Sequence, residues 1–199
     1  MKLIFTCRFR GSGLWLVLAA LLAFPGIAYG QHGLDLDGHA LNPLRADQAK
    51  VVVLVFLRKD CPISSRYAPT IKQISERYAD NASFWLVFPD KTETVQAIRK
   101  YLQDYGYHLP ALRDPKHELV KMSRVQVTPE AAVFDRSRRL VYDGRIDDWY
   151  RYPGGSRPAP TTHDLEDSVR AAIAGKAVDQ NVDQKNEARG VGCYISDLD

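Results

Sequence analysis

Cysteine is scarce in this 199-residue chain, which contains three residues of this type. Three cysteines are too few for the disulfide-rich scaffolds that stabilise many small secreted proteins. The five histidines do not recur at spacings typical of metal ligands, so the sequence predicts no metal site and no cofactor. Internal repeats and low-complexity stretches are also missing. These absences favour one ordinary globular domain, for which the chain is long enough.

Positive charge and a long apolar run occur together only at the N-terminus. Residues 1–30 hold three basic residues, an apolar stretch at residues 14–23 and a small-x-small site at residues 28–30. This order predicts a signal peptide cleaved after Gly30, and therefore export to the periplasm or the extracellular space. An uncleaved N-terminal anchor is the alternative, although the apolar stretch is short for a membrane span. After cleavage, no stable membrane insertion is expected.

Net charge gives no indication of a nucleic-acid partner. The whole chain has 27 basic and 24 acidic residues, and residues 1–30 contain three of the basic ones and none of the acidic ones. Removal of this segment leaves 24 of each sign, so the mature chain is formally neutral. Binding to nucleic acid or to an anionic membrane surface depends on an excess of positive charge. Neither is predicted as a partner.

The stretch around Cys61 carries the strongest chemical signal. Seven apolar residues at 51–57 predict a strand buried on both faces, and a helical pattern begins just after Cys61. Pro62 suits the first turn of that helix, where its missing N–H needs no partner. A cysteine at a helix N-terminus is stabilised as a thiolate, which is the reactive form of the side chain. The corner therefore indicates redox chemistry.

The remaining pattern predicts an α/β fold with a mixed central sheet and flanking helices. Strands are expected at residues 33–38, 51–57, 83–88, 130–134 and 140–142. Helices are expected from Cys61 to about Tyr78, from Thr92 to about Tyr105 with Tyr105 on the buried face, over residues 117–123, and over residues 163–174 between a Thr162 cap and Gly175. Residues 109–114 are predicted to be an irregular link and residues 149–162 a loop.

Four motifs in order resemble the exported peroxiredoxin-like redoxins of the thioredoxin superfamily, the alkyl hydroperoxide reductase/thiol-specific-antioxidant type. These motifs are Asp-Cys-Pro-Ile at 60–63, Thr-Pro-Glu at 128–130, residues 142–148 and Gly-Cys at 192–193. The resemblance covers roughly residues 34–196 and implies a thioredoxin-like redoxin domain, which is assigned to residues 31–175. The signal peptide at 1–30 precedes it, and the polar sequence after Gly175 predicts a flexible tail at 176–199. The resemblance further implies that Pro69 kinks the helix that follows Cys61.

The resemblance also implies a substrate-binding surface next to Cys61. In similar proteins a cis proline faces the reactive cysteine, so Thr128 and Pro129 are expected beside Cys61, with an ordinary trans proline as the alternative. Pro62 and Ser64 complete the predicted surface. Ser64 stands where thioredoxins have a second cysteine. Arg58 stands where peroxiredoxins have a threonine, and Ser65 replaces the second cysteine of copper-delivery relatives.

Cys193 follows Cys61 by 132 residues and allows three interpretations. It is a resolving cysteine that attacks an adduct on Cys61, a permanent disulfide partner of Cys61, or a cysteine that pairs with another molecule. Glycines next to Cys193 favour mobility, and therefore the resolving role.

The sequence as a whole predicts an exported thiol-disulfide oxidoreductase. Cys61 is the expected thiolate nucleophile and Cys193 the resolving cysteine. The expected partners are a protein with a thiol or disulfide, or a small thiol or peroxide. A thiol-dependent peroxidase is one alternative. A redoxin module without catalysis, which binds a partner or a metal through the same corner, is the other.

Overall fold

The computed structural model describes residues 33–46, 50–178, 189–196 and 198. The predicted signal peptide and most of the predicted linker before Cys193 lie outside these residues. Within the described part of the chain, no helix is long and apolar enough to span a membrane.

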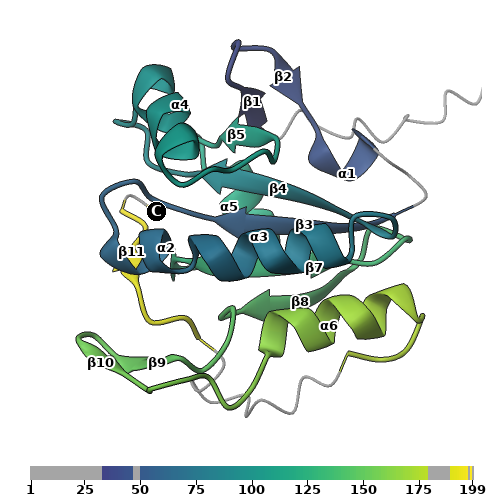
Figure 1. Cartoon of the computed structure of the whole chain (residues 1–199). Coiled ribbons are helices and arrows are strands. Elements are labelled where there is room, and N and C mark those ends of the chain that lie inside the picture. Colours follow the sequence, from purple (N-terminus) through teal and green to yellow (C-terminus); the bar gives the residue numbers. More distant parts are fainter. Residues whose placement is uncertain (1–32, 47–49, 179–188, 197, 199) are drawn as a thin grey trace, which may run out of the picture.

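One mixed sheet of seven strands forms the centre of the molecule (Figure 1). Its middle strands are parallel to each other, and the strands that follow the Thr128–Pro129 bond join it antiparallel. This arrangement confirms the predicted mixed α/β sheet. From one edge to the other, the order is β2 (Ala40–Leu41), β1 (Gly33–Asp35), β5 (Ala111–Arg113), β4 (Ala82–Phe88), β3 (Val51–Phe56), β7 (Glu130–Phe134) and β8 (Leu140–Gly144).

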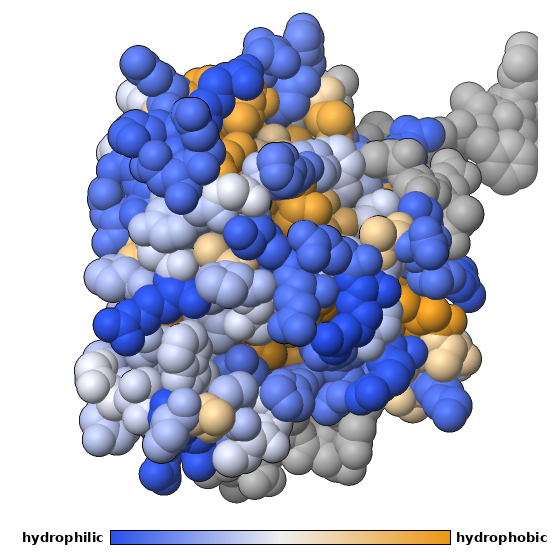
Figure 2. Space-filling view, in the orientation of Figure 1, coloured by the Kyte–Doolittle hydropathy of each residue, from blue (hydrophilic) through white to orange (hydrophobic). Residues whose placement is uncertain are grey.

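Helices cover both faces of the sheet because alternate residues of β3 point to opposite sides. Val51, Val53 and Val55 pack in one apolar cluster with residues of α3 (Ala68–Arg77), α4 (Val95–Asp104) and α6 (Asp164–Ile173). The other face packs against α1 (Pro43–Ala46) and α5 (Glu118–Ser123). Hydrophilic residues cover most of the outer surface on the α3 and α6 side, with hydrophobic residues in separate patches (Figure 2). All six residues of β3 are buried, as its apolar sequence predicts.

Two short two-stranded sheets lie outside the central one. β9 (Tyr150–Tyr152) pairs with β10 (Gly155–Ser156), and β6 (Val127–Thr128) pairs with β11 (Cys193–Tyr194). Both lie at the end of the molecule where α2 (Pro62–Arg66) begins (Figure 1). The end of the chain that carries Cys193 is therefore brought to the corner that carries Cys61.

The helix predicted after Cys61 is present but divided. α2 ends at Arg66 and α3 begins at Ala68, with Pro69 in the first turn of α3. Proline has no backbone N–H to continue the ladder of the preceding helix, which explains the break. The expected kink at this proline is confirmed.

The prediction for the next helix was wrong in two details. Thr92 binds Asp90 in a turn, and Thr94 caps α4 by accepting the Ala97 N–H at 3.2 Å. The helix therefore begins at Val95, later than expected. Tyr105 follows its last residue and is 37% exposed, whereas Tyr101 is buried.

Three later segments also differ from the predictions. The expected irregular link contains β5, whose three residues pair with β4 and β1 and are too few to show an alternating pattern. The expected loop contains the β9–β10 hairpin, which turns at Gly154 with a φ of +81°. The Thr162 hydroxyl binds Asp164 at 2.6 Å and does not cap α6. Gly175 ends α6 with a φ of +65°, as predicted.

Candidate active site

Cys61 sits where β3 passes into α2. It is the N-cap residue of α2 with extended backbone angles, and Pro62 occupies the first turn. Its own N–H donates to the Arg58 carbonyl at 3.1 Å, which closes the turn between strand and helix. The Cys61 side chain is fully buried, whereas Pro62 next to it is exposed. The predicted strand–cysteine–helix corner is confirmed.

Thr128 and Pro129 lie against this cysteine, as expected. The bond between them is cis, which excludes the trans alternative. In its thiol form, the Cys61 side chain donates to the Thr128 carbonyl at 3.1 Å. The backbone of β6 therefore runs directly past the sulfur atom.

Cys193, near the C-terminus, also contacts Cys61. Its Sγ lies 2.7 Å from the Cys61 Sγ, and both cysteines are free thiols. β11 holds Cys193 in place because it pairs antiparallel with β6, with Cys193 opposite Thr128. The Thr128 hydroxyl donates to the Cys193 carbonyl at 3.3 Å. A short movement would bring the sulfurs to the roughly 2.05 Å of a disulfide bond.

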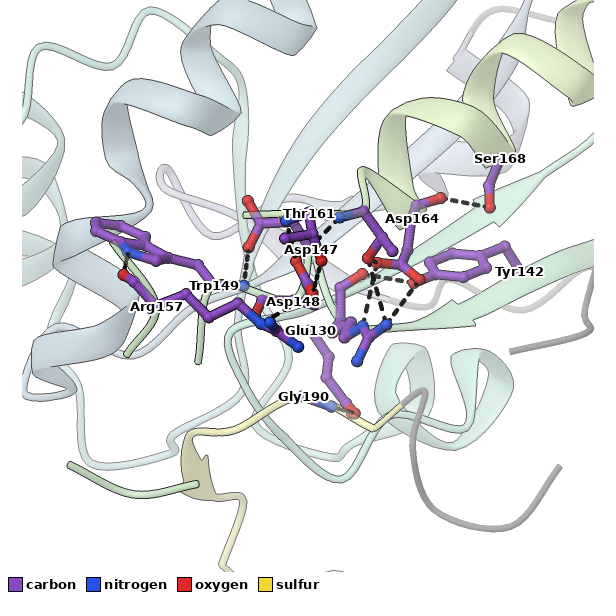
Figure 3. Close-up of polar contacts among 12 residues, drawn as sticks. Glu130, Tyr142, Asp147, Asp148, Trp149, Arg157, Thr161, Asp164, Ser168 and Gly190 are labelled. Carbon is purple, nitrogen blue, oxygen red and sulfur yellow. Dashed lines mark hydrogen bonds and ion pairs between the residues drawn. The ribbon is translucent and has the colours of Figure 1, made fainter. Parts of the chain in front are cut away.

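A buried carboxylate holds the segment that carries Cys193. Glu130 is fully buried, and its Oε1 accepts the Gly190 N–H at 2.8 Å (Figure 3). Its other oxygen accepts the N–H groups of Gln126 and Val127, so the same side chain braces β6. Burial raises the pKa of Glu130, and the hydrogen bonds from Gln126, Gly190 and Val127 oppose this rise. Glu130 therefore links the Cys193 segment to the strand beside Cys61.

The glycines near Cys193 serve close packing in this structure. A Cβ added to Gly192 would lie 2.1 Å from the Thr128 carbonyl oxygen, and one added to Gly190 would lie 2.8 Å from the Pro129 oxygen. Both neighbours are backbone atoms, which cannot rotate away. The mobility expected from these glycines stays a prediction, and the structure adds a second reason for their presence. Only glycine allows this segment to approach β6 so closely.

Electrostatics assign different protonation states to the two sulfurs. Burial opposes the thiolate of Cys61, but hydrogen bonds from Cys193, Ser64 and Ile63 outweigh it and lower the pKa of Cys61. Burial and the neighbouring Cys61 raise the pKa of Cys193 to about 11. When Cys61 is ionised, Cys193 is therefore a thiol that donates to the Cys61 thiolate. Cys61 is the better nucleophile of the pair.

Arg58 is the cationic side chain that acts on Cys193. Its charge opposes the rise in the pKa of Cys193. Its Nε lies 3.1 Å from Asp90 Oδ2, an ion pair in which the N–H is not well aligned with the carboxylate. Arg58 therefore contributes charge at this corner, where peroxiredoxins have a threonine hydroxyl.

Ser64 faces the Cys61 sulfur from one turn into α2. Its side chain is fully buried, and its hydroxyl and backbone N–H both lower the pKa of Cys61. The same hydroxyl accepts the Arg58 N–H at 3.4 Å. The residue in the place of a second cysteine thus stabilises the thiolate.

Replacing Ser64 with alanine should raise the pKa of Cys61 by about one unit, because one hydrogen bond to the thiolate is lost. The measurement is the rate of Cys61 alkylation by iodoacetamide across pH, in variants that also carry Cys193→Ser. Ser65→Ala is the matched control, because the Ser65 hydroxyl interacts with Tyr101. An equal shift in both variants, or none in either, would contradict the role of Ser64.

Glu93 is a site residue that the sequence did not reveal. It is 2% exposed, and its Oε1 accepts the Lys59 N–H at 2.8 Å in the turn before Cys61. Its Oε2 is buried and has no hydrogen-bond partner among the described residues. Burial, together with nearby Asp90 and Asp60, raises the pKa of Glu93 to about 7 against the pull of Lys59. No local pattern marks a glutamate that turns inward ahead of a helix.

Glu93→Gln should change how stability depends on pH. The neutral form of Glu93 stabilises the fold below pH 4.5, and this contribution is lost as pH rises through about 7. From about pH 4.5 to about pH 8, wild type should lose on the order of 2–3 kcal/mol relative to the variant, whose amide can still accept from Lys59. Urea unfolding measures this difference, with exposed Glu76→Gln as the control. Parallel pH curves for wild type and Glu93→Gln would contradict the assignment.

Charged residues at 145–148, which follow β8, make contacts that hold neighbouring segments together. Arg145 pairs with Asp164 through two contacts of 3.1 Å, and Asp148 binds Thr161 and Arg157 (Figure 3). Asp147 accepts from the Tyr67 hydroxyl at 2.5 Å. These contacts fix α6 and the hairpin region around the site.

Comparison with known proteins agrees with this geometry. A family model described as thioredoxin-like matches residues 48–140, which include Cys61 and Pro129 but not Cys193. No curated protein matches the sequence. A hypothetical protein from Sinorhizobium meliloti has a TM-score of 0.67 at 25% identity, covering 82% of this chain and 88% of that one.

Two structures with a described activity or location share the fold. A secreted Mycobacterium tuberculosis disulfide oxidoreductase has a TM-score of 0.50 at 16% identity, covering 73% of this chain and 96% of that one. An exposed lipoprotein thioredoxin from Streptococcus pneumoniae has a TM-score of 0.52 at 19% identity, with coverages of 72% and 96%. The chain therefore has a thioredoxin-like fold.

Proposed function

We propose that this protein is an exported thiol-disulfide oxidoreductase in which Cys61 is the nucleophile and Cys193 the resolving cysteine. The observation that carries the proposal is the 2.7 Å approach of the two sulfurs beside a cis proline, combined with opposite shifts in their pKa values. A nucleophile needs a low pKa to be ionised, and a second thiol within reach removes the adduct that the first one forms. The pair supplies both functions.

The exchange proceeds in two steps. The Cys61 thiolate attacks one sulfur of a substrate disulfide, the substrate S–S bond breaks, and the leaving sulfur departs as a thiolate that takes a proton from solvent. Cys193 then loses its proton and attacks the Cys61 sulfur. The bond between Cys61 and the substrate breaks, and the substrate sulfur leaves and is protonated. One disulfide has been reduced and the Cys61–Cys193 disulfide formed, and the reverse steps oxidise a dithiol.

Neighbouring groups support these roles. The Ser64 hydroxyl and backbone N–H stabilise the attacking thiolate. Exposed Pro62 and the backbone of Thr128 and Pro129 border the sulfur and form the surface that the substrate meets. Export fits a disulfide exchanger, because disulfides persist in oxidising compartments. The secreted and surface-exposed proteins of the same fold act in this setting, and the predicted signal peptide would send this chain there.

The Cys193→Ser variant tests the proposal. With a protein disulfide such as insulin as substrate, the variant should accumulate a mixed disulfide on Cys61 and turn over at least about tenfold more slowly than wild type. Mass spectrometry of acid-quenched samples measures the adduct. Equal turnover with no adduct would contradict the resolving role. If peroxide converts Cys61 to a sulfenic acid, and disulfides form no adduct with it, the protein would instead be a peroxidase.

A further inference from the structure

The segment that carries Cys193 covers the reactive sulfur. Cys61 is fully buried, and its sulfur contacts Cys193 and the Thr128 carbonyl. A substrate disulfide has to reach this sulfur, so residues 190–195 must leave β6 before the reaction. Their departure exposes the backbone edge of β6, the Thr128 hydroxyl and the Glu130 carboxylate.

Residues 190–195 are fitted closely to this edge. Cys193 and Tyr194 pair antiparallel with Thr128 and Val127, and the Ile195 N–H donates to the Gln126 carbonyl at 3.0 Å. The Gly190 N–H donates to Glu130 at 2.8 Å. Backbone hydrogen bonds of this kind accept any extended polypeptide, because they involve no side chain of the added strand. The edge is therefore a docking site for an added strand.

Side-chain positions restrict which strand can bind. The position before the cysteine has room only for glycine, because a Cβ there would lie 2.1 Å from the Thr128 oxygen. Two residues after the cysteine, Ile195 is 9% exposed and packs in the apolar cluster with Val120 and Val125. Between them, Tyr194 is 79% exposed, so that position accepts any side chain. The edge of β6 therefore favours a strand with glycine, cysteine, any residue and an apolar residue, in this order.

We propose that the edge of β6 binds the protein substrate, as an extended segment with glycine immediately before its reactive cysteine and an apolar residue two positions after it. This rests on the proposed thiol-disulfide exchange at Cys61. Residues 190–195 occupy the same place and act as an internal mimic of that segment. The Cys61 thiolate attacks the sulfur of the docked cysteine, and the other sulfur of the substrate disulfide leaves as a thiolate and is protonated. The bound segment, still linked to Cys61 by the mixed disulfide, must then leave the edge of β6. Cys193 can then return and attack the Cys61 sulfur, which breaks the bond to the substrate and releases it.

Short peptides test this selectivity. The probe is Gly-Val-Gly-Cys-Tyr-Ile-Ser with thionitrobenzoate in disulfide linkage to its cysteine, so that attack on the peptide sulfur releases a yellow product. The protein is the full chain with Gly192→Val and Cys193→Ser, which frees the edge and prevents resolution. Comparison peptides carry valine before the cysteine, or aspartate in place of isoleucine. Reaction of each peptide with glutathione corrects for its intrinsic reactivity.

After this correction, the peptide Gly-Val-Gly-Cys-Tyr-Ile-Ser should modify Cys61 about tenfold faster than either comparison peptide. The three peptides should have the same order of corrected rates, at lower values, with the full-length Cys193→Ser variant. This single variant provides the test if the double variant does not fold. Corrected rates that agree among the three peptides would overturn the proposal. So would modification of Cys61 by dithiobis(nitrobenzoate) but by no peptide. If Cys61 reacts with neither, the proposed exchange activity fails as well.

Discussion

Replacing Cys61 with serine should reduce thiol-disulfide exchange by at least about a thousandfold, because the nucleophile is lost. A serine hydroxyl is not ionised near neutral pH and does not form a stable adduct with a disulfide sulfur. The measurement is the reduction of insulin disulfides with dithiothreitol as electron donor, compared with the rate of dithiothreitol alone. The expected rate in the variant equals that of the uncatalysed reaction.

Loss of activity should not come from unfolding. The serine hydroxyl can donate to the Thr128 carbonyl, which accepts from the Cys61 thiol at 3.1 Å, so the buried polar group keeps a partner. Circular dichroism and a urea melt should therefore match those of wild type closely. The Cys193→Ser variant is the matched control, with slower turnover and a trapped adduct. Retained exchange in Cys61→Ser would show that another residue performs the chemistry.

Gly192→Val should expose Cys61 to reagents. A Cβ at this position would lie 2.1 Å from the Thr128 oxygen and 2.7 Å from the Thr128 carbonyl carbon, so the pairing of β11 with β6 is weakened. Overpacking of this kind costs roughly 1–3 kcal/mol, which corresponds to an increase of about 5- to 150-fold in the open population. The alkylation rate of reduced Cys61 should rise by a similar factor. Peptide mass spectrometry after timed exposure to iodoacetamide gives this rate.

Tyr194→Val is the matched control for that experiment. It introduces valine two positions after Gly192, in β11, where the native Tyr194 side chain is 79% exposed. It should leave the alkylation rate of Cys61 within about twofold of wild type, because surface substitutions rarely change stability by more than about 0.5 kcal/mol. Similar rates in Gly192→Val and in wild type would mean that residues 190–195 do not cover Cys61.

The features that sequence reasoning found are those with a local cause. β3 is a run of apolar residues long enough to be read as a buried strand, and Pro62 and Pro69 mark the start and the break of the helix after it. Resemblance to redoxins added the cis bond at Pro129, which composition does not indicate. The corner around Cys61 was therefore predictable almost residue by residue.

The features that it missed depend on contacts between distant segments. β5 has three residues and is a strand only because β4 and β1 lie on either side of it. Gly192 looks mobile in sequence, and its closeness to Thr128 appears only when the chain end is folded back. Glu130 belongs to the Thr-Pro-Glu motif, but its hydrogen bond to Gly190 joins positions 60 residues apart, which no local pattern predicts. Glu93 turns inward in a segment with no apolar pattern to mark it.

We expect Cys61 and Cys193 to exchange electrons as one redox pair. A redox titration of the wild-type protein in glutathione buffers tests this directly, with the free thiols alkylated and the products digested and analysed by mass spectrometry. The peptides containing Cys61 and Cys193 should become joined by a disulfide as the buffer is made more oxidising. They should separate again, fully and reversibly, on reduction. If each cysteine instead carries its own glutathione at every potential, and no joined peptide forms, Cys61 and Cys193 are not one redox pair.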